Sequence, residues 1–226
     1  MATRLYTVSG TPSVSPSPAA VWDATAAAFE RLLLDTVASG FVQAGGLSPG
    51  SGVANDDTVR FQGIYGPLAA GAISGTVQGQ VACREANGAT DARTQILIRV
   101  LDPPATGLRG TLLALDTAAL SSEFVVSSSG AGQSRMSPRG GAVALASVTA
   151  QAGDWLVVEW GFRNHGTNTN NVFVRSGSAG ATADLAAGDE TTNADAGPVY
   201  RGWIEFSQTL ALYVPAQGRS HGYVIT

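Results

Sequence analysis

The stretch nearest to a catalytic motif is Gly218-Arg219-Ser220-His221-Gly222. It matches G-x-S-x-G, in which a serine nucleophile sits on a sharp strand-to-helix turn and the acid and histidine come later in the chain. Only four residues follow Gly222, so that order is not possible here. A serine–histidine pair formed in space stays open, since triads are defined by geometry, but the sequence holds only His165 and His221. We therefore expect no catalytic residues and a protein that is not an enzyme.

Acidic residues in two turn-like stretches are the candidate metal ligands. They are Asp56 and Asp57, after Asn55, and the group Asp184, Asp189, Glu190 and Asp195. Oxygen ligands suit Ca²⁺, but EF-hand spacing is missing, and Asn, Asp and Gly are first of all turn formers. One Cys and two His make neither a zinc site nor a disulfide framework. The prediction is that the chain binds no metal and no cofactor.

Aromatic and polar side chains supply the candidate contact residues. Trp155 falls on the face opposite to Trp160 and beside Glu159, so it is the tryptophan that we expect to contact a glycan or a partner, with Trp203 and Tyr200 as further members of a sugar-stacking platform. Residues 164–171 form a polar loop. Its candidates for partner or glycan contact are His165, Asn168 and Asn170. The alternative interpretation of the loop is a plain hairpin tip.

The composition excludes several classes of protein. Charged residues make up 13% of 226 residues, all 13 cationic side chains are arginine, and the net charge is −4. Without lysine there is no P-loop, Schiff-base nucleophile or kinase-type ATP site. Scattered arginines and a negative net charge argue against nucleic-acid binding. A surface with so few charges is suited to packing in an assembly, with a GC-rich genome as the alternative explanation.

Targeting signals are not evident in the sequence. No apolar run approaches the ~18–20 residues of a membrane helix, and Met1–Tyr6 lacks the apolar core of a signal peptide. We therefore expect synthesis in the cytoplasm and no membrane insertion.

The elements that must position these residues are predicted to be β-strands. Clear alternation spans 73–84, 94–101 and 154–163. Shorter strands are expected at 58–65, 108–115, 122–127, 141–149, 171–175, 200–206, 209–214 and 222–226. Cys83 falls on an inward face and is expected to be buried. Residues 20–37 stay ambiguous, because Trp22, Ala26, Phe29 and Leu33 have helical spacing while 32–37 also fit a strand. Many short strands separated by turns predict an all-β fold, an antiparallel jelly-roll-like β-sandwich.

The segment before the sandwich is rich in proline. Pro12, Pro16 and Pro18 fix φ and remove backbone donors, so residues 1–19 are expected to be an extended N-terminal arm. The three prolines would contact neighbouring subunits, or else form a plain connector after a short first strand. The sandwich domain is expected over 20–207, and 208–226 would add one or more C-terminal strands that engage another subunit. Deleting 1–19 is expected to leave a folded domain that no longer joins particles.

A resemblance to a known family agrees with these expectations. Its parts, in order, are Met1–Tyr6, a Ser-Gly-Thr-Pro-x-Val-x-Pro stretch, Trp22, Ile73–Val77, Ala152–Glu159 and Trp203–Ser207. This order resembles tailed-bacteriophage structural proteins whose sandwich is similar to the jelly rolls of carbohydrate-binding and virion decoration domains. The resemblance suggests that 20–37 is extended, and it brings no catalytic residues.

The function that the resemblance implies is structural. It predicts a non-enzymatic protein of the virion, made in the bacterial host cytoplasm and placed on the capsid exterior (decoration or cement) or on the tail. Its partners would be copies of itself and other virion proteins. The alternative is a carbohydrate-binding, host-attachment module of a tail or fibre that contacts a host surface glycan.

Overall fold

The computed structural model of the chain shows an all-β protein. It describes residues 1–38, 40, 47–49, 53–116, 121, 123–124, 126, 133–136, 141–168, 170–176, 184 and 201–215. The strands are β1 (Thr3–Val8), β2 (Ala24–Asp35), β3 (Leu47–Pro49), β4 (Asp56–Tyr65), β5 (Gly71–Ile73), β6 (Thr76–Glu85), β7 (Ala92–Leu101), β8 (Leu108–Leu113), β9 (Gln133–Met136), β10 (Val143–Ala144), β11 (Val148–Ala150), β12 (Trp155–Asn164), β13 (Asn171–Arg175) and β14 (Trp203–Phe206). A single 3-10 turn, η1 (Gly88–Thr90), interrupts them within the described residues. No described helix has the length and apolar character to cross a membrane.

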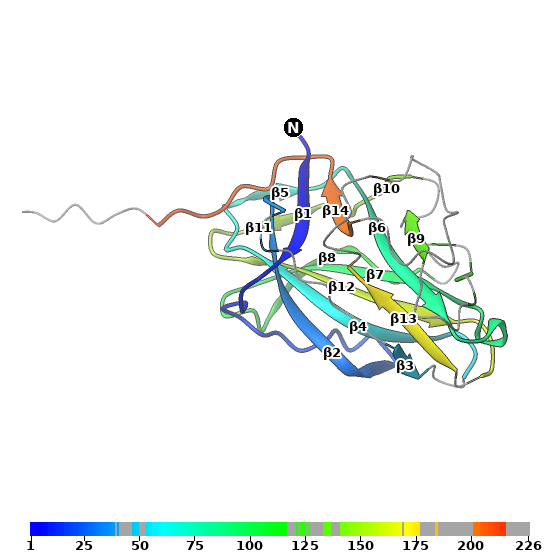
Figure 1. Cartoon of the computed structure of the whole chain (residues 1–226). Helices are drawn as coiled ribbons and strands as arrows, with labels where there is room; N and C mark the ends of the chain where they lie inside the picture. Colours follow the sequence, from blue (N-terminus) through cyan, green and yellow to red (C-terminus); the bar gives the residue numbers. More distant parts are fainter. Residues whose placement is uncertain are drawn as a thin grey trace, which may run out of the picture.

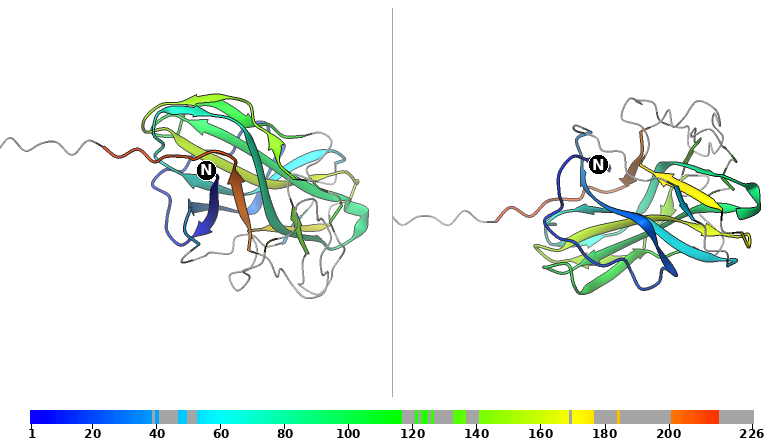
Figure 2. Two further views of the ribbon diagram at one scale, coloured as in Figure 1. Left: turned by 90° about the horizontal axis from the view of Figure 1, so that it is seen from above. Right: turned by 60° about the horizontal axis from the view of Figure 1, so that its bottom comes forward.

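The strands form two layers that share β1 (Figure 1). One layer has the order β3-β13-β6-β14, with β9 and β10 also paired to β6. The other has the order β2-β4-β12-β7-β8, and β5 and β11 form a separate pair. Figure 2 shows the two layers from further directions. The predicted all-β sandwich is confirmed, but the main sheet is mixed, because β2 runs parallel to β4.

Strand β1 changes layer halfway along its length. Its first half pairs with β14, with Leu5 opposite Ile204, and its second half pairs with β2, with Val8 opposite Leu33. Leu5 is fully buried between the layers. The expected arm over 1–19 therefore needs correction, since residues 3–8 belong to the sheet and only the part after them is a connecting segment. Deleting 1–19 would remove this strand.

The core lies between the two layers and follows the predicted alternation. On β12, Leu156, Val158, Trp160 and Phe162 are all buried in it, as the spacing predicts. Cys83 is buried on the core face of β6, also as predicted. The expected strand over 73–84 is divided in two, because Gly75 has a φ of +86° that ends the extended backbone between β5 and β6.

Residues 24–35 form a strand, which settles the ambiguity over 20–37 in favour of extended structure. The helical spacing arises from an irregularity, because Thr25 faces Val59 while Glu30 faces Phe61, so β2 carries extra residues between them. The buried side chain of Arg60 lies at this point and donates a hydrogen bond to the carbonyl oxygen of Ala28. A bulge that an arginine fills from the neighbouring strand has no signature in residue periodicity.

Truncation of Leu5 tests the double role of β1. We expect Leu5→Ala to lower the free energy of unfolding in urea by about 2–5 kcal/mol, because a fully buried side chain leaves a cavity between the layers. The control is Val37→Ala at a position that is 59% exposed, where a change within about 0.5 kcal/mol is expected. Equal effects of the two substitutions would contradict the placement of β1.

Candidate functional site

A buried carboxylate organises the outer face of the layer that contains β4, β12 and β7. Glu159 points away from the core and is fully buried. It accepts hydrogen bonds from Trp22 Nε1 at 2.8 Å and Gln62 Nε2 at 2.8 Å, and it forms an ion pair with Arg99 Nη2 at 2.6 Å. The backbone N–H of Ala19 also donates to its Oε2 at 3.2 Å. One side chain of β12 therefore links β4, β7 and the segment that covers them.

The covering segment, residues 9–23, lies over this face of its own domain. Arg99 donates to the carbonyl oxygen of Ser17 at 3.1 Å. Pro12 and Pro16 are buried and Pro18 is half-buried. The sequence leaves open whether these prolines contact other subunits or form a plain connector after a short first strand. Within the chain two of them are already covered by the domain itself, so the segment holds the sheet face and leaves little open proline surface.

The two tryptophans expected in a glycan platform differ in exposure. Trp155 is half-buried, and a Cβ at Gly66 would lie 2.9 Å from its Cε3. Trp203 is 4% exposed, with the guanidinium of Arg4 4.0 Å above its ring and its Nε1 donating to Asp184 at 2.9 Å. Tyr200 lies outside the described residues. Trp203 therefore offers no open ring face, whereas Trp155 remains partly exposed.

The polar loop between β12 and β13 is a corner between the layers. Its backbone N–H groups at His165 and Gly166 donate to the carbonyl oxygens of Asp91 (3.1 Å) and Thr90 (2.8 Å), and Asn168 Nδ2 donates to Ala89 O at 3.1 Å. Burial, together with the nearby charge of Arg93, lowers the pKa of His165. Asn168 is exposed, whereas His165 and Asn170 are half-buried. The structure thus ties this loop to the β6–β7 connection.

The candidate metal ligands are drawn into separate ion pairs. Asp57 lies 2.8 Å from Arg163 Nη1, and Asp184 lies 2.5 Å from Arg4 Nη1. No group of three or more potential ligands occurs among the described residues. Burial outweighs the attraction of Arg163 and raises the pKa of Asp57 to about 6. Asp189, Glu190 and Asp195, like Ser220 and His221, lie outside the described part of the chain.

An acid pair at the end of β6 was not among the sequence candidates. Glu85 is fully buried, and its Oε2 accepts a hydrogen bond from the backbone N–H of Ala92 at 2.9 Å. Burial raises the pKa of Glu85, and the charges of Glu123 and Asp91 raise it further. Continuing the alternation of 73–83 places residue 85 on the core face, which was the available signal. Its partner Glu123 lies far from Glu85 in the sequence, and no sequence pattern indicated that the two residues would meet.

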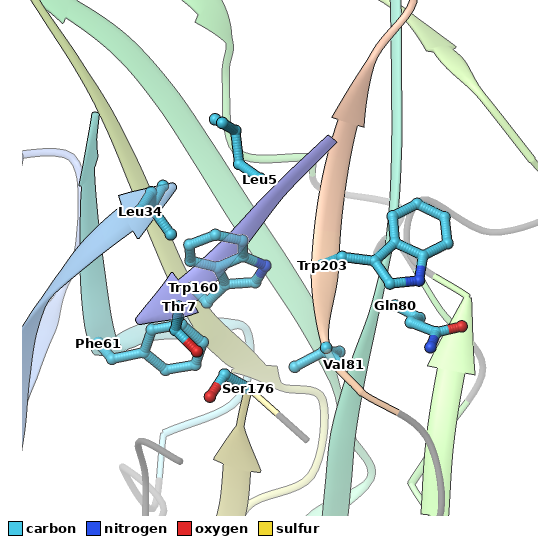
Figure 3. A pocket seen from close by; sticks show the side chains of 10 residues that line it. Leu5, Thr7, Leu34, Phe61, Gln80, Val81, Trp160, Ser176 and Trp203 are labelled. Carbon is cyan, nitrogen blue, oxygen red and sulfur yellow. The ribbon is translucent and has the colours of Figure 1, made fainter. Parts of the chain in front are cut away.

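A small cavity lies beneath β1 in the interior of the sandwich (Figure 3). Its apolar lining includes Leu5, Leu34 and Val81, and it includes the stacked rings of Phe61 and Trp160, whose centroids are 4.9 Å apart. The cavity has a volume of about 10 Å³, which is enough for one water molecule. This cavity therefore does not accommodate a substrate.

A larger depression lies on the outer face of the same layer as Glu159. This outer-face groove has a volume of about 520 Å³ and is lined by Ala19, Ala20, Val21, Asp57, Leu97, Arg99, Leu108, Thr111, Ala114, Leu115 and Arg163. One rim is the end of the covering segment and the other is β8. Val21 and Leu108 are each 61% exposed on these rims.

The chain after β14 forms a tail segment, residues 208–215, that follows residues 67–69. Ala69 N donates to Ala211 O at 2.8 Å, and Tyr213 N donates to Pro67 O at 2.9 Å. Figures 1 and 2 show the segment then running away from the body of the domain. Leu212, Tyr213 and Val214 are 48%, 39% and 79% exposed. Three consecutive large apolar residues are thus presented to solvent.

Comparisons of the chain with protein-family models, with curated proteins and with solved structures gave no match.

Loss of the Glu159 charge tests the network on the outer face. We expect Glu159→Gln to lower the free energy of unfolding by about 3–5 kcal/mol, because the guanidinium of Arg99, which is 11% exposed, would lose its buried counter-charge. Asp35→Asn removes a charge of the same sign at an exposed position and should change stability by less than about 0.5 kcal/mol. A small effect of Glu159→Gln in urea denaturation would show that the network is not needed.

The raised pKa values of Asp57 and Glu85 fix the direction of one pH effect. The unfolded chain releases these protons first as the pH rises, so the two groups stabilise the folded chain fully below about pH 4 and lose that contribution as the pH passes their raised pKa values. His165, with its lowered pKa, acts in the opposite sense below about pH 6.5.

The test is therefore to measure the free energy of unfolding of the parent chain and of Glu85→Gln as a function of pH. We expect the free energy of unfolding of the parent to fall between pH 5 and pH 8, and the variant to lose part of this fall and be the more stable protein at pH 8. Identical pH dependence of the two proteins would contradict the buried acid pair.

Proposed function

We propose that the chain is a non-enzymatic structural subunit of a virus particle, of the tailed-bacteriophage type that its sequence resembles. It works by binding copies of itself and companion particle proteins. The observation that carries the proposal is the tail segment, in which the neighbouring side chains of Leu212, Tyr213 and Val214 are 48%, 39% and 79% exposed. Contiguous exposed apolar side chains mark interaction sites on soluble proteins.

The architecture of the domain supports this role. The polar groups on its outer face bind one another, as Glu159 does with Trp22, Gln62 and Arg99. The corner loop that holds His165 and Asn168 is bonded to the neighbouring connection rather than held open. A rigid sandwich with an extended apolar segment is suited to assembly by contact, where affinity comes from burying the segment against another chain.

Sedimentation of the full chain tests self-association. We expect the parent to associate as its concentration rises and the double variant Leu212→Asp/Val214→Asp to remain a monomer, because each aspartate would have to be desolvated in the contact. Val37→Asp is the matched control at another exposed valine and should associate like the parent. A parent that stays monomeric at about 100 µM, or a double variant that associates normally, would contradict the proposal.

The virus assignment has a separate test. Mass spectrometry of particles purified from the organism that encodes the chain should identify it as a particle protein, and antibody labelling should place it on the outer surface of head or tail. Its consistent absence from purified particles would overturn the assignment to a virion.

A further inference from the structure

Exposed large apolar side chains gather at two places among the described residues. One is the tail segment, with Leu212, Tyr213 and Val214. The other is the outer-face groove, where Val21 and Leu108 stand on opposite rims. Met1 lies beside the tail segment, where its carbonyl oxygen accepts a hydrogen bond from Thr209, and the remaining exposed large apolar side chains are single residues elsewhere. An exposed apolar segment and an apolar depression therefore occur on the same molecule.

The shape of the groove suits an extended chain. Arg99 lies opposite Val157 in the sheet, and Arg163 lies six residues further along β12. At about 3.3 Å per residue these positions are about 20 Å apart. Both arginines line the groove, so it runs along the direction of β12.

The charges of the groove are already balanced. Arg99 is paired with Glu159 at 2.6 Å, and Arg163 is paired with Asp57 at 2.8 Å. An occupant therefore needs no charge of its own, and a charged one would enter beside a matched pair. Residues 208–215, Gln-Thr-Leu-Ala-Leu-Tyr-Val-Pro, contain no charged side chain.

The residues that line the groove favour a peptide over a sugar as its ligand. Its apolar members are Ala, Val and Leu, and no aromatic ring is among the lining residues. Sugars are usually bound on aromatic faces, whereas aliphatic side chains pack well on aliphatic walls. The groove thus favours an uncharged, extended, apolar peptide segment.

We infer that the exposed side chains of the tail segment, Leu212, Tyr213 and Val214, of one copy pack into the outer-face groove of a second copy, between the rims formed by Val21 and Leu108. This inference rests on the proposed function and adds the receiving surface to it. The tail does not occupy the groove of its own chain, because its side chains are 39–79% exposed there. A contact between two different surfaces is head-to-tail, so it builds rings or filaments rather than closed pairs.

The test uses two variants of the full chain that block opposite sides of the contact. Val21→Glu/Leu108→Glu alters the groove at exposed positions, and Leu212→Asp/Val214→Asp alters the tail. Each variant alone should self-associate about 100-fold more weakly than the parent, at about tenfold per introduced charge. An equimolar mixture should form a 1:1 dimer, because one intact tail and one intact groove remain.

Several outcomes would overturn the inference. If the groove variant associates like the parent while the tail variant does not, the proposed self-association stands and the groove is not its receiver. If both variants are weakened but their mixture stays monomeric, tail and groove do not bind each other. Circular dichroism checks folding, Val37→Glu is the control for charge, and Thr111→Arg blocks the groove from β8 if the double groove variant does not fold.

Discussion

The carboxylate of Glu159 is the interaction on which the outer face of the molecule depends. It is fully buried away from the main core and is satisfied by Trp22, Gln62, Arg99 and the backbone of Ala19. An isolated buried charge is strongly unfavourable, so these partners must be in place when the chain folds. Because Ala19 and Trp22 flank Val21, the same network sets one rim of the outer-face groove and holds Arg99 in its floor.

Strand β1 supplies the second constraint, because it joins the two layers. Its pairing with β14 holds the strand from which the tail segment continues, and its pairing with β2 holds the layer that carries the groove. Tail and groove are thus held at fixed positions in one domain. This arrangement lets a small number of exposed apolar side chains act as a defined contact and keeps the rest of the surface uninvolved.

The sequence predicts the strands better than their connections. Alternation on β12 identifies the core faces of Trp160 and Phe162, since a period of two survives wherever pairing is regular. It fails on β2, where a bulge filled by Arg60 imitates helical spacing, and at Gly75, whose positive φ divides a continuous pattern. The polar network around Glu159 and the partner of Glu85 depend on residues far apart in the chain, which local periodicity does not encode. The apolar tail lies within the predicted C-terminal segment 208–226, but the groove is lined by five separate stretches of the chain and has no local signal.

Disulfide trapping tests the central claim most directly. Cys83 is fully buried, so it should give little background when Val214→Cys and Thr111→Cys are made in separate full chains and mixed under mild oxidation. The account predicts a covalent dimer that contains one copy of each variant, with little product from either variant alone. Equal dimer formation by the Val214→Cys chain alone, or no specific product from the mixture, would contradict a tail that binds in the groove of another copy.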